Sequence, residues 1–375
     1  MRGERVHKGK GCFSLPFRLL LGLVYLAFLI SYGVALLSPV VSPLTSHIPA
    51  LFNLAFGLIL LALVFFLVYF LWHLRKSGLL LVIHLLLIAF TVNYLTTYFP
   101  LNVAEGLTDA KELRVMTYNV ERFAHRLSKD SSPYAVSVIH KYKPDILCIQ
   151  ESPNLGSRQK TAKWYRDSFP KEEYPYMDVC NAKGLVLLSK YPLREARMVE
   201  YESYTNGTMS YLIDVKGETL LLVNNHLESY GLTREEKSKY KEYIKDPDAN
   251  QLMERFKEVT RRLYPNMNLR VNAALSTRRD VDRTLREQSP EMVLILGDFN
   301  DTPMSYAYSV LRGRDMKDAF QQVGFGPGIS YNERLFPFRI DHVLYKGGLK
   351  AVGGDIPWLK EASDHNPVII DFKLD

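Results

Sequence analysis

The amino-acid sequence predicts an α/β domain in which two β-sheets are layered face to face and covered by helices. A membrane region of three helices precedes this domain in the chain. From Arg114 onward, apolar strand-like runs interleave with helical patterns. Before that point lie three apolar stretches of about membrane-spanning length. Several of the strand-like runs also end in short polar sequences, which would collect along one rim of a sheet.

The three apolar stretches are nearly free of charge and occupy residues 19–37, 50–72 and 79–99. A cleaved signal peptide is the alternative for the first stretch, but two more stretches follow at once and no small-residue cleavage site is evident. We therefore expect residues 1–100 to form three transmembrane helices that hold the protein in a lipid bilayer.

The basic residues predict the orientation. Five Lys or Arg residues precede or begin the first stretch, Arg75 and Lys76 lie between the second and third, and residues 38–49 contain neither. The positive-inside rule then places the N-terminus in the cytoplasm. With three spans, everything after residue 100 lies on the other side. We expect an integral protein of a bacterial inner or plasma membrane with an extracytoplasmic soluble part.

Residues 101–110 are expected to be a linker, and residues 111–375 a folded domain. Strands are expected at 114–120, 145–150, 184–189, 209–215, 219–226, 292–297, 341–345 and 367–373. Helices are expected near 132–143, 159–169, 251–288, 304–312 and 315–323.

One segment, at about residues 228–270, is an insertion crowded with charges of both signs. A solvated helix with i,i+4 pairs is one interpretation, and a lid or membrane-surface element is the other. The position directly after His226 favours a functional role, whereas the nearly balanced charge argues against strong attraction to lipid.

The net charge of +7 has little meaning for the soluble part. Residues 1–110 hold seven basic and three acidic residues, which leaves 40 basic and 37 acidic residues in the remainder. That balance is too even for a general nucleic-acid-binding surface. Of the three cysteines, Cys148 and Cys180 could form a disulfide, but two buried free thiols are favoured.

The polar sequences at the ends of the strand-like runs supply carboxylates, amides and imidazoles, but no suitable Ser or Cys nucleophile. This set is the one needed to bind a hard cation and to perform acid–base chemistry on a phosphate ester. It predicts a metal-dependent phosphodiesterase. The sequences are Thr117-Tyr118-Asn119, Gln150-Glu151, Asn225-His226, Gly297-Asp298-Phe299-Asn300 and Ser363-Asp364-His365.

The carboxylates and amides of this set also fit ordinary structural roles when each is taken alone. Glu151 could be a helix N-terminal or surface carboxylate, and Asn119 a turn residue. Asp298 and Asn300 could belong to an ordinary turn after Gly297.

The histidines have a structural alternative as well. His226 and His365 could be core or rim histidines with satisfied hydrogen bonds, and Asp341 could simply pair with Arg339. The order and spacing of all these residues together are more specific than any one of them.

Seven short sequences are informative along the chain, and six of them carry these residues. They are Thr-Tyr-Asn-Val, Pro-Asp-Ile-Leu-Cys-Ile-Gln-Glu, Gly-Leu-Val-Leu-Leu-Ser-Lys-Tyr-Pro, Asn-His-Leu, Gly-Asp-Phe-Asn-Asp-Thr-Pro, Arg-Ile-Asp-His-Val-Leu and Ser-Asp-His-Asn-Pro-Val. In this order they resemble the endonuclease/exonuclease/phosphatase superfamily, which includes AP endonucleases, pancreatic-type deoxyribonucleases, neutral sphingomyelinases and inositol polyphosphate 5-phosphatases. The resemblance runs from about Arg114 to Phe372 and does not include the three spans.

The resemblance implies a four-layered α/β sandwich and a divalent cation, usually Mg²⁺ and sometimes Mn²⁺ or Ca²⁺. By motif, Glu151 would be the principal metal ligand, with Asn119 and Asp364 completing or supporting the site. Among the catalytic residues, Asp298 would orient or deprotonate the attacking water, and Asn300 would hold a phosphate oxygen.

The remaining roles implied by the resemblance concern the imidazoles. His365 would bind and neutralise phosphoryl oxygens, while Asp341 would pair with a histidine and fix its charge. His226 matches a second histidine of the deoxyribonuclease and sphingomyelinase branches, whereas the AP-endonuclease branch carries a Tyr-bearing motif there.

The sequence therefore predicts a membrane-anchored, divalent-metal-dependent phosphodiesterase or phosphatase, nuclease-like, acting outside the cytoplasm. The alternative is a sphingomyelinase-like or phosphoinositide-type phospholipid hydrolase, since anchoring brings lipid head groups within reach. We find no basic, aromatic-interleaved stretch that would track a nucleic-acid strand. A non-catalytic binding protein on the same fold would show degenerate motifs, and these are intact.

Overall fold

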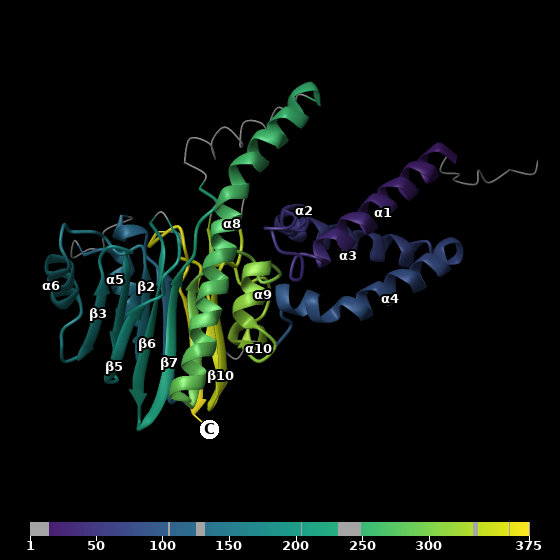
Figure 1. Ribbon diagram of the computed structural model, residues 1–375. Coiled ribbons are helices and arrows are strands. Elements are labelled where there is room, and N and C mark those ends of the chain that lie inside the picture. Colours follow the sequence, from purple (N-terminus) through teal and green to yellow (C-terminus); the bar gives the residue numbers. More distant parts are fainter. Residues whose placement is uncertain are drawn as a thin grey trace, which may run out of the picture.

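The computed structural model describes residues 15–103, 106–124, 132–203, 205–231, 249–332, 337–359 and 361–374. The basic residues that precede Arg18, and residues 232–248 of the charged insertion, lie outside the described residues. In the described part, two six-stranded sheets stand beside a bundle of apolar helices (Figure 1).

The first sheet has the strand order β11-β12-β1-β2-β4-β3. Only β1 and β2 run parallel among its neighbouring strands, with Asn119 level with Gln150, so both strands end at the same edge. The bounds are β1 (Leu113–Asn119), β2 (Ile146–Gln150), β3 (Tyr176–Cys180), β4 (Leu185–Ser189), β11 (Leu349–Asp355) and β12 (Val368–Leu374).

The second sheet has the order β5-β6-β7-β8-β10-β9. Here β7 and β8 are parallel, with His226 level with Asp298, and Asp341 at the start of β10 lies opposite Asp298. The bounds are β5 (Leu193–Met198), β6 (Gly207–Val215), β7 (Glu218–His226), β8 (Met292–Asp298), β9 (Lys317–Asp318) and β10 (Asp341–Gly347).

The central strands are apolar throughout because alternate residues face different layers. Val115 and Leu294 belong to the core between the two sheets. Met116 packs with residues of the helices outside the first sheet, and Val293 with residues of the helices outside the second. Helices, sheet, sheet and helices form four layers, and the predicted sandwich is confirmed.

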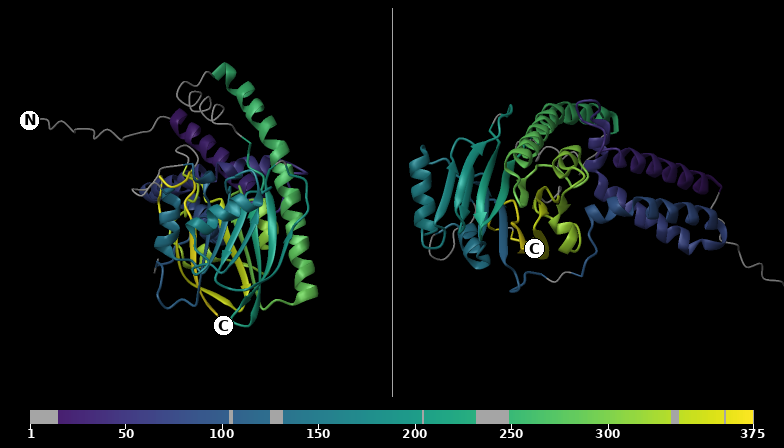
Figure 2. Two further views of the ribbon diagram at one scale, coloured as in Figure 1. Left: turned by 90° about the vertical axis from the view of Figure 1, so that its left-hand side faces the viewer. Right: turned by 60° about the horizontal axis from the view of Figure 1, so that its bottom comes forward.

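The helices of the soluble part are η1 (Glu121–Phe123), α5 (Tyr134–Tyr142), α6 (Arg158–Ser168), α8 (Ala249–Gln288), α9 (Tyr306–Arg312) and α10 (Ala319–Val323). Helix α8 runs along the sandwich and extends beyond the edge of the sheets (Figures 1 and 2). It corresponds to the helix expected near 251–288. Its C-terminal half packs on the second sheet through Ala273, Ala274 and Val281.

The membrane region contains α1 (Leu15–Leu36), α2 (Ile48–Leu54), α3 (Phe56–Trp72) and α4 (Leu74–Tyr98). Two segments, Pro16–Leu36 and Ser77–Tyr98, are long and apolar enough to cross a membrane. The expected middle span is bent by 67° between α2 and α3, and it counts as a third span only if this pair is taken as one.

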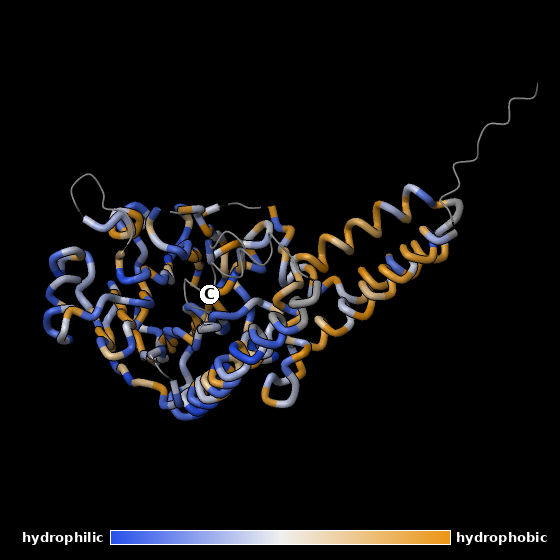
Figure 3. The backbone as a smooth tube through the Cα atoms, turned by 90° about the horizontal axis from the view of Figure 1, so that it is seen from above, coloured by the Kyte–Doolittle hydropathy of each residue, from blue (hydrophilic) through white to orange (hydrophobic). Residues whose placement is uncertain are grey.

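The bundle runs back and forth beside the soluble domain. Helix α1 leads toward the domain, α3 leads away from it and α4 returns to it (Figure 1). The hydrophobic residues are concentrated in these helices (Figure 3). Their outward faces expose large apolar side chains, such as Leu58 at 71% and Phe90 at 84%, which suits contact with lipid rather than water.

A buried polar contact ties the bundle together. The His84 imidazole lies between the Tyr25 hydroxyl, 3.2 Å from Nδ1, and the Leu63 carbonyl, 3.0 Å from Nε2. The Tyr32 and Thr91 hydroxyls lie 2.6 Å apart across the same two helices, α1 and α4. These polar groups are satisfied inside the bundle, as an apolar environment requires.

Cys148 and Cys180 are both free thiols, as the sequence favoured. Cys148 is buried in β2, and burial raises the pKa of its thiol. Cys180, at the end of β3, is only partly buried, which corrects the expectation of two buried thiols.

Candidate active site

The parallel strand pairs bring the predicted site residues to one edge of the sandwich. Asn119 ends β1 in the first sheet, while His226 and Asp298 end β7 and β8 in the second. Asp341 begins β10 at the same edge because β10 is antiparallel to β8. The carboxyl ends of parallel strands are the usual place for a site in such sheets.

Asn119 joins the two sheets at this edge. Its Nδ2 donates to Oε1 of Glu151 at 3.1 Å and to Oδ2 of Asp298 at 3.0 Å. The carboxylate of Asp298 is buried, whereas the Glu151 side chain is 34% exposed and is therefore open to a ligand. Glu151 follows β2 with a φ of 52°, a left-handed conformation that costs a non-glycine residue free energy and is typical of functional sites.

Two imidazoles flank the Asp298 carboxylate. His226 Nε2 lies 3.7 Å from Asp298 Oδ2 and 3.7 Å from Glu151 Oε1. His365 Nε2 lies 3.8 Å from the same Asp298 oxygen, and His365 Nδ1 donates to Asp341 Oδ2 at 2.8 Å. The structure thus brings together residues that are up to 246 positions apart, from Asn119 to His365.

Burial and the neighbouring charges fix the protonation of this group. The pKa of Asp298 is raised to about 6, because burial and the Asp341 carboxylate together outweigh the opposing effect of the two histidines. Burial would lower the pKa of His365, but Asp341 and Asp298 outweigh burial and raise that pKa well above its ordinary value. His365 is therefore a cation near neutral pH.

A second cluster of carboxylates lies beside the first. The pKa of Asp364 is raised to about 6, because burial and the carboxylates of Glu121 and Glu151 together outweigh the opposing effect of His365. The Asp364 backbone N–H lies 3.3 Å from Glu121 Oε2. Carboxylate oxygens are ligands that a hard divalent cation prefers, and a bound cation would offset the repulsion between them.

Glu121 is the residue of this cluster that the sequence did not identify. Its backbone N–H donates to Asn119 Oδ1 at 3.1 Å, and it begins η1 with a φ of 41°. Its place two residues after Asn119, in a short acidic turn at a strand end, is the signal that could have found it.

Asp298, Asp341 and His365 also place one ligand atom each within 4.8 Å of one another. This trio is less suited to a metal than the carboxylate cluster. Asp341 Oδ2 already accepts from His365, and a protonated imidazole has no lone pair to give to a metal.

Asn300 is held by its own backbone and by the end of β7. Its backbone N–H donates to Asp298 Oδ1 at 2.8 Å, and its Nδ2 donates to the Leu227 carbonyl at 2.8 Å. Since an amide nitrogen carries two hydrogens, one N–H remains for a further acceptor. Gly297 has a φ of 125°, and a Cβ there would lie 2.0 Å from the Asn225 carbonyl oxygen, so glycine is required.

The alternative pairing of Asp341 with Arg339 is not what the structure shows. Arg339 donates to Asp318 Oδ2 at 2.8 Å, and both side chains are buried. Asp341 is left for His365.

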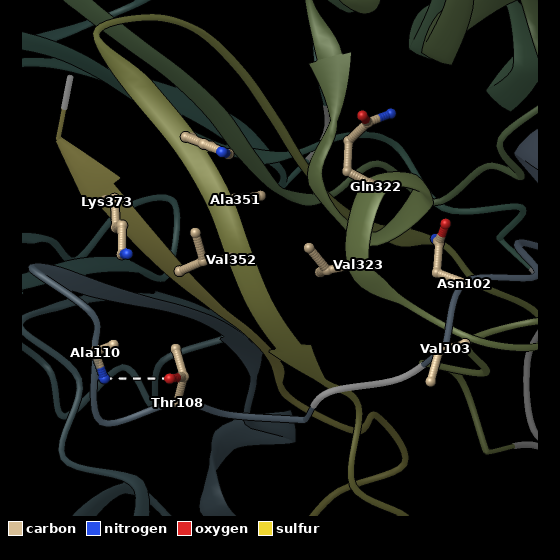
Figure 4. A pocket seen from close by; sticks show the side chains of 10 residues that line it. Asn102, Val103, Thr108, Ala110, Gln322, Val323, Ala351, Val352 and Lys373 are labelled. Atoms are coloured by element: carbon tan, nitrogen blue, oxygen red, sulfur yellow. Dashed lines mark hydrogen bonds between the residues drawn. The ribbon is translucent and has the colours of Figure 1, made fainter.

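The pocket in Figure 4 lies apart from this site. It has a volume of about 440 Å³ and is lined by residues of the expected linker, the end of α10, β11 and β12, with none of the predicted site residues among them. Its cationic groups are Lys350 and Lys373.

The fold and the site define an α/β-sandwich protein with acidic and imidazole groups at the carboxyl ends of its parallel strands. A model of the endonuclease/exonuclease/phosphatase family matches residues 116–365. The chain belongs to this family, whose members are hydrolases that act on phosphate esters.

Three solved structures are among those to which this chain is similar. An endonuclease/exonuclease/phosphatase from Beutenbergia cavernae is 18% identical, over 70% of this chain and 72% of that chain, with a TM-score of 0.46. The human Nocturnin catalytic domain with bound sulfate is 16% identical, over 72% and 96%, with a TM-score of 0.47. TDP2 from C. elegans is 18% identical, over 71% and 76%, with a TM-score of 0.47. No curated protein matches this chain.

Proposed function

We propose that this protein is a membrane-anchored, divalent-metal-dependent phosphodiesterase or phosphatase, with residues 111–375 as its catalytic domain. The observation that supports this most directly is the imidazolium of His365, paired with Asp341 and placed 3.8 Å from Asp298, next to a cluster of carboxylates. A phosphate ester needs positive charge for its oxygens and a base for the attacking water, and this arrangement offers both.

Glu151, Asn119 and Asp364 would hold the cation. Their oxygen ligands suit Mg²⁺, with Mn²⁺ or Ca²⁺ as substitutes. When bound, the cation would stabilise the negative charge that develops on the phosphate oxygens.

The residues of the chain would divide the acid–base work. The Asp298 carboxylate would orient the attacking water and accept its proton, and it is ionised above a pH of about 6. His365 would neutralise the phosphate oxygens, and Asp341 keeps that imidazole protonated and oriented. His226 would give a proton to the leaving oxygen, and the remaining N–H of Asn300 would bind a phosphate oxygen.

The course of the membrane helices supports an extracytoplasmic site. Three crossings, by α1, by the bent pair α2 and α3 taken as one span, and by α4, would put the soluble domain at the opposite end of the bundle from the start of α1. Arg18 near the start of α1 and Arg75 and Lys76 at the start of α4 mark that other end, which the positive-inside rule assigns to the cytoplasm. With 17 residues, α3 is at the short end of the spanning range.

The test uses the purified full-length protein in detergent and a soluble phosphodiester, bis(p-nitrophenyl) phosphate. We expect EDTA to abolish turnover and added Mg²⁺ or Mn²⁺ to restore it. Glu151→Gln should raise the Mg²⁺ concentration needed for half-maximal activity by about tenfold or more, because it removes a charged metal ligand.

Glu218→Gln is the matched control, since Glu218 is an exposed glutamate at the other end of β7. It should behave as the wild type. Turnover that resists EDTA, or a wild-type Mg²⁺ response in Glu151→Gln, would contradict the proposed metal site.

A further inference from the structure

The membrane region contacts a loop that carries proposed catalytic residues. Asn53 in α2 and Thr302 are each 1% exposed, and Asn53 Nδ2 donates to Thr302 Oγ1 at 2.7 Å. Thr302 follows Asn300 by two residues, so the two backbones are within roughly 7 Å of each other. The end of the second sheet is therefore fixed directly to α2.

A second contact fixes the strand that carries Asp341. Near the end of α4, the Thr97 carbonyl accepts from Arg339 Nη2 at 2.6 Å, and the Thr97 hydroxyl accepts from Gln321 Nε2 at 3.0 Å. Arg339 is 3% exposed and precedes Asp341 by two residues. Buried charge-assisted hydrogen bonds of this kind are among the stronger polar contacts in proteins.

We call the contacts of α2 and the end of α4 with the soluble domain the junction. Apolar and aromatic contacts also contribute to it. Met304, two residues after Thr302, is buried in the apolar cluster of the membrane helices. The His47 ring stacks on Tyr264 of α8 with 3.9 Å between the ring centroids, and His47 Nε2 lies 3.1 Å from Asn268 Oδ1.

The described start of the expected linker is docked as well. The Asn102 side chain donates to the carbonyls of Gln321 and Gly324 at 2.8 and 3.0 Å. The Gly326 N–H donates to the Pro100 carbonyl at 2.9 Å. A domain held at both α2 and the end of α4 cannot swing freely away from the bilayer.

This junction places the site beside the domain-side end of the apolar helices. Helices α1 and α4 end beside the soluble domain (Figure 1), and the bond from Asn53 in α2 to Thr302 holds the loop that carries Asn300 at the same end. With α1 and α4 spanning the bilayer, their domain-side ends lie at the head-group layer, where phosphate esters of lipids are found.

We infer that the substrate is a phosphate ester of a lipid head group in the same bilayer, an inference that rests on the proposed function. Water would add across one P–O bond of the head-group ester, giving a phosphorylated fragment and an alcohol. A site fixed at one height acts on esters presented at that height, and docking avoids the entropic cost of ordering a free tether at each encounter.

Nucleic acid fits the same position less well. The part of the chain after residue 110 offers 40 basic against 37 acidic residues, without a basic track, so it provides little attraction for a polyanion. The charge balance that disfavours nucleic acid imposes no penalty on a single head group.

The experiment places the full-length protein in nanodiscs made of equal parts phosphatidylcholine, phosphatidylglycerol and sphingomyelin, with Mg²⁺. Head-group release is followed by phosphorus NMR, and bis(p-nitrophenyl) phosphate and plasmid DNA are tested in parallel. We expect head-group hydrolysis at least tenfold faster per enzyme than DNA cleavage. Cleavage of DNA with intact head groups would overturn the inference and leave the proposed function standing. Failure on all substrates, the soluble diester included, would overturn the proposed function itself.

Two variants test the role of the junction. Asn53→Leu removes the bond to Thr302, and His47→Ala removes the stack on Tyr264, while neither residue belongs to the proposed catalytic set. We expect the ratio of head-group to soluble-diester turnover to fall about fivefold or more in each. Asn272→Leu, at an exposed amide on α8, is the matched control and should keep the wild-type ratio. An unchanged ratio in both junction variants would contradict a positional role, because a purely structural effect lowers both activities together.

Discussion

The hydrogen bond between His365 and Asp341 sets the charge at the centre of the site. The bond is 2.8 Å long and buried, and together with Asp298 it raises the pKa of His365 well above its ordinary value. Without Asp341, burial would favour the neutral imidazole. The positive charge that would meet the phosphate therefore depends on a residue that need not touch the phosphate.

Asp341→Asn is expected to lower kcat for the soluble diester by roughly 100-fold, in the range typical of lost acid–base catalysis. Since Asp341 would act through His365, the double variant Asp341→Asn with His365→Ala should lose little more turnover than His365→Ala alone. Turnover of the single and double variants checks this. Losses that multiply would show that the two residues act independently.

His342, next to Asp341, has a different role. Burial and the Arg339 guanidinium together lower the pKa of His342 to about 4. Its Nε2–H donates to the Asp301 carbonyl at 2.9 Å, so the neutral ring holds the loop after β8. A buried neutral histidine gives the fold a dependence on pH that is separate from catalysis.

The direction in which stability changes with pH follows from the lowered pKa of His342. The unfolded chain takes up a proton at a pH near 6.5, and the folded chain only near 4, so the contribution of neutral His342 is complete above 6.5 and is lost as the pH falls toward 4. Between pH 7 and pH 5 the loss is about 2 kcal/mol. His342→Gln should flatten this part of the curve of melting temperature against pH. An equally steep curve in the variant would exclude His342 as the cause.

At the residue scale, the sequence predicted which side chains lie close together, but it missed one acidic residue among them. Asn119, His226, Asp298, Asp341 and His365 come together as expected because parallel strands end at one edge. Glu121 was missed because its role depends on a left-handed turn that local propensity does not favour, and the metal ligands remain a proposal.

At the scale of elements, the central strands were predicted and the peripheral ones were not. Strands buried on both faces read as continuous apolar runs, as in Met292–Asp298. The edge strands β3 and β5 carry exposed residues, and β11 contains two glycines, so their sequences resemble loops. The helix expected from 315 begins only at Ala319 because Lys317–Asp318 pairs with β10.

The bend between α2 and α3 was also missed, for a related reason. The apolar run from 50 to 72 continues without a break through Ala55, so hydropathy alone predicts one straight span. The bend accompanies a distant contact, in which Asn53 in α2 donates to Thr302 at 2.7 Å. Local sequence cannot reveal a contact with a residue so far along the chain.

Gly297 at the end of β8 gives a prediction at this scale. Gly297→Ala would place a Cβ against the Asn225 carbonyl oxygen in a backbone with φ of 125°, and the parallel pair β7–β8 must shift. We expect a loss of stability of more than about 2 kcal/mol together with loss of turnover. Thermal unfolding and diester turnover measure both.

Gly217→Ala is the control for backbone strain alone. Gly217 has a φ of 97° with nothing within 4 Å of its added Cβ. The Gly217→Ala variant should lose roughly 1–2 kcal/mol of stability and keep its activity. Equal losses in the two variants would mean that the close approach at Gly297 has no special cost.

At the scale of the whole molecule, the order of the helices predicts the side on which the domain lies. Alkaline phosphatase, which is active only outside the cytoplasm, should be active when fused after Asp375 and inactive when fused after Lys76. The paired fusions control for expression. An inactive fusion after Asp375, with a fluorescent reporter active there instead, would place the domain in the cytoplasm.

The docking of the membrane region has a consequence for how the protein is made. Asn53 and Thr302 are 249 positions apart, and Thr97 and Arg339 are 242 apart. Because a ribosome delivers the N-terminus first, the apolar helices are made long before Thr302 and Arg339, and this junction can close only after both residues have emerged. A nascent chain that stops before Thr302 thus carries the apolar helices but lacks the residues that dock the α/β domain against them.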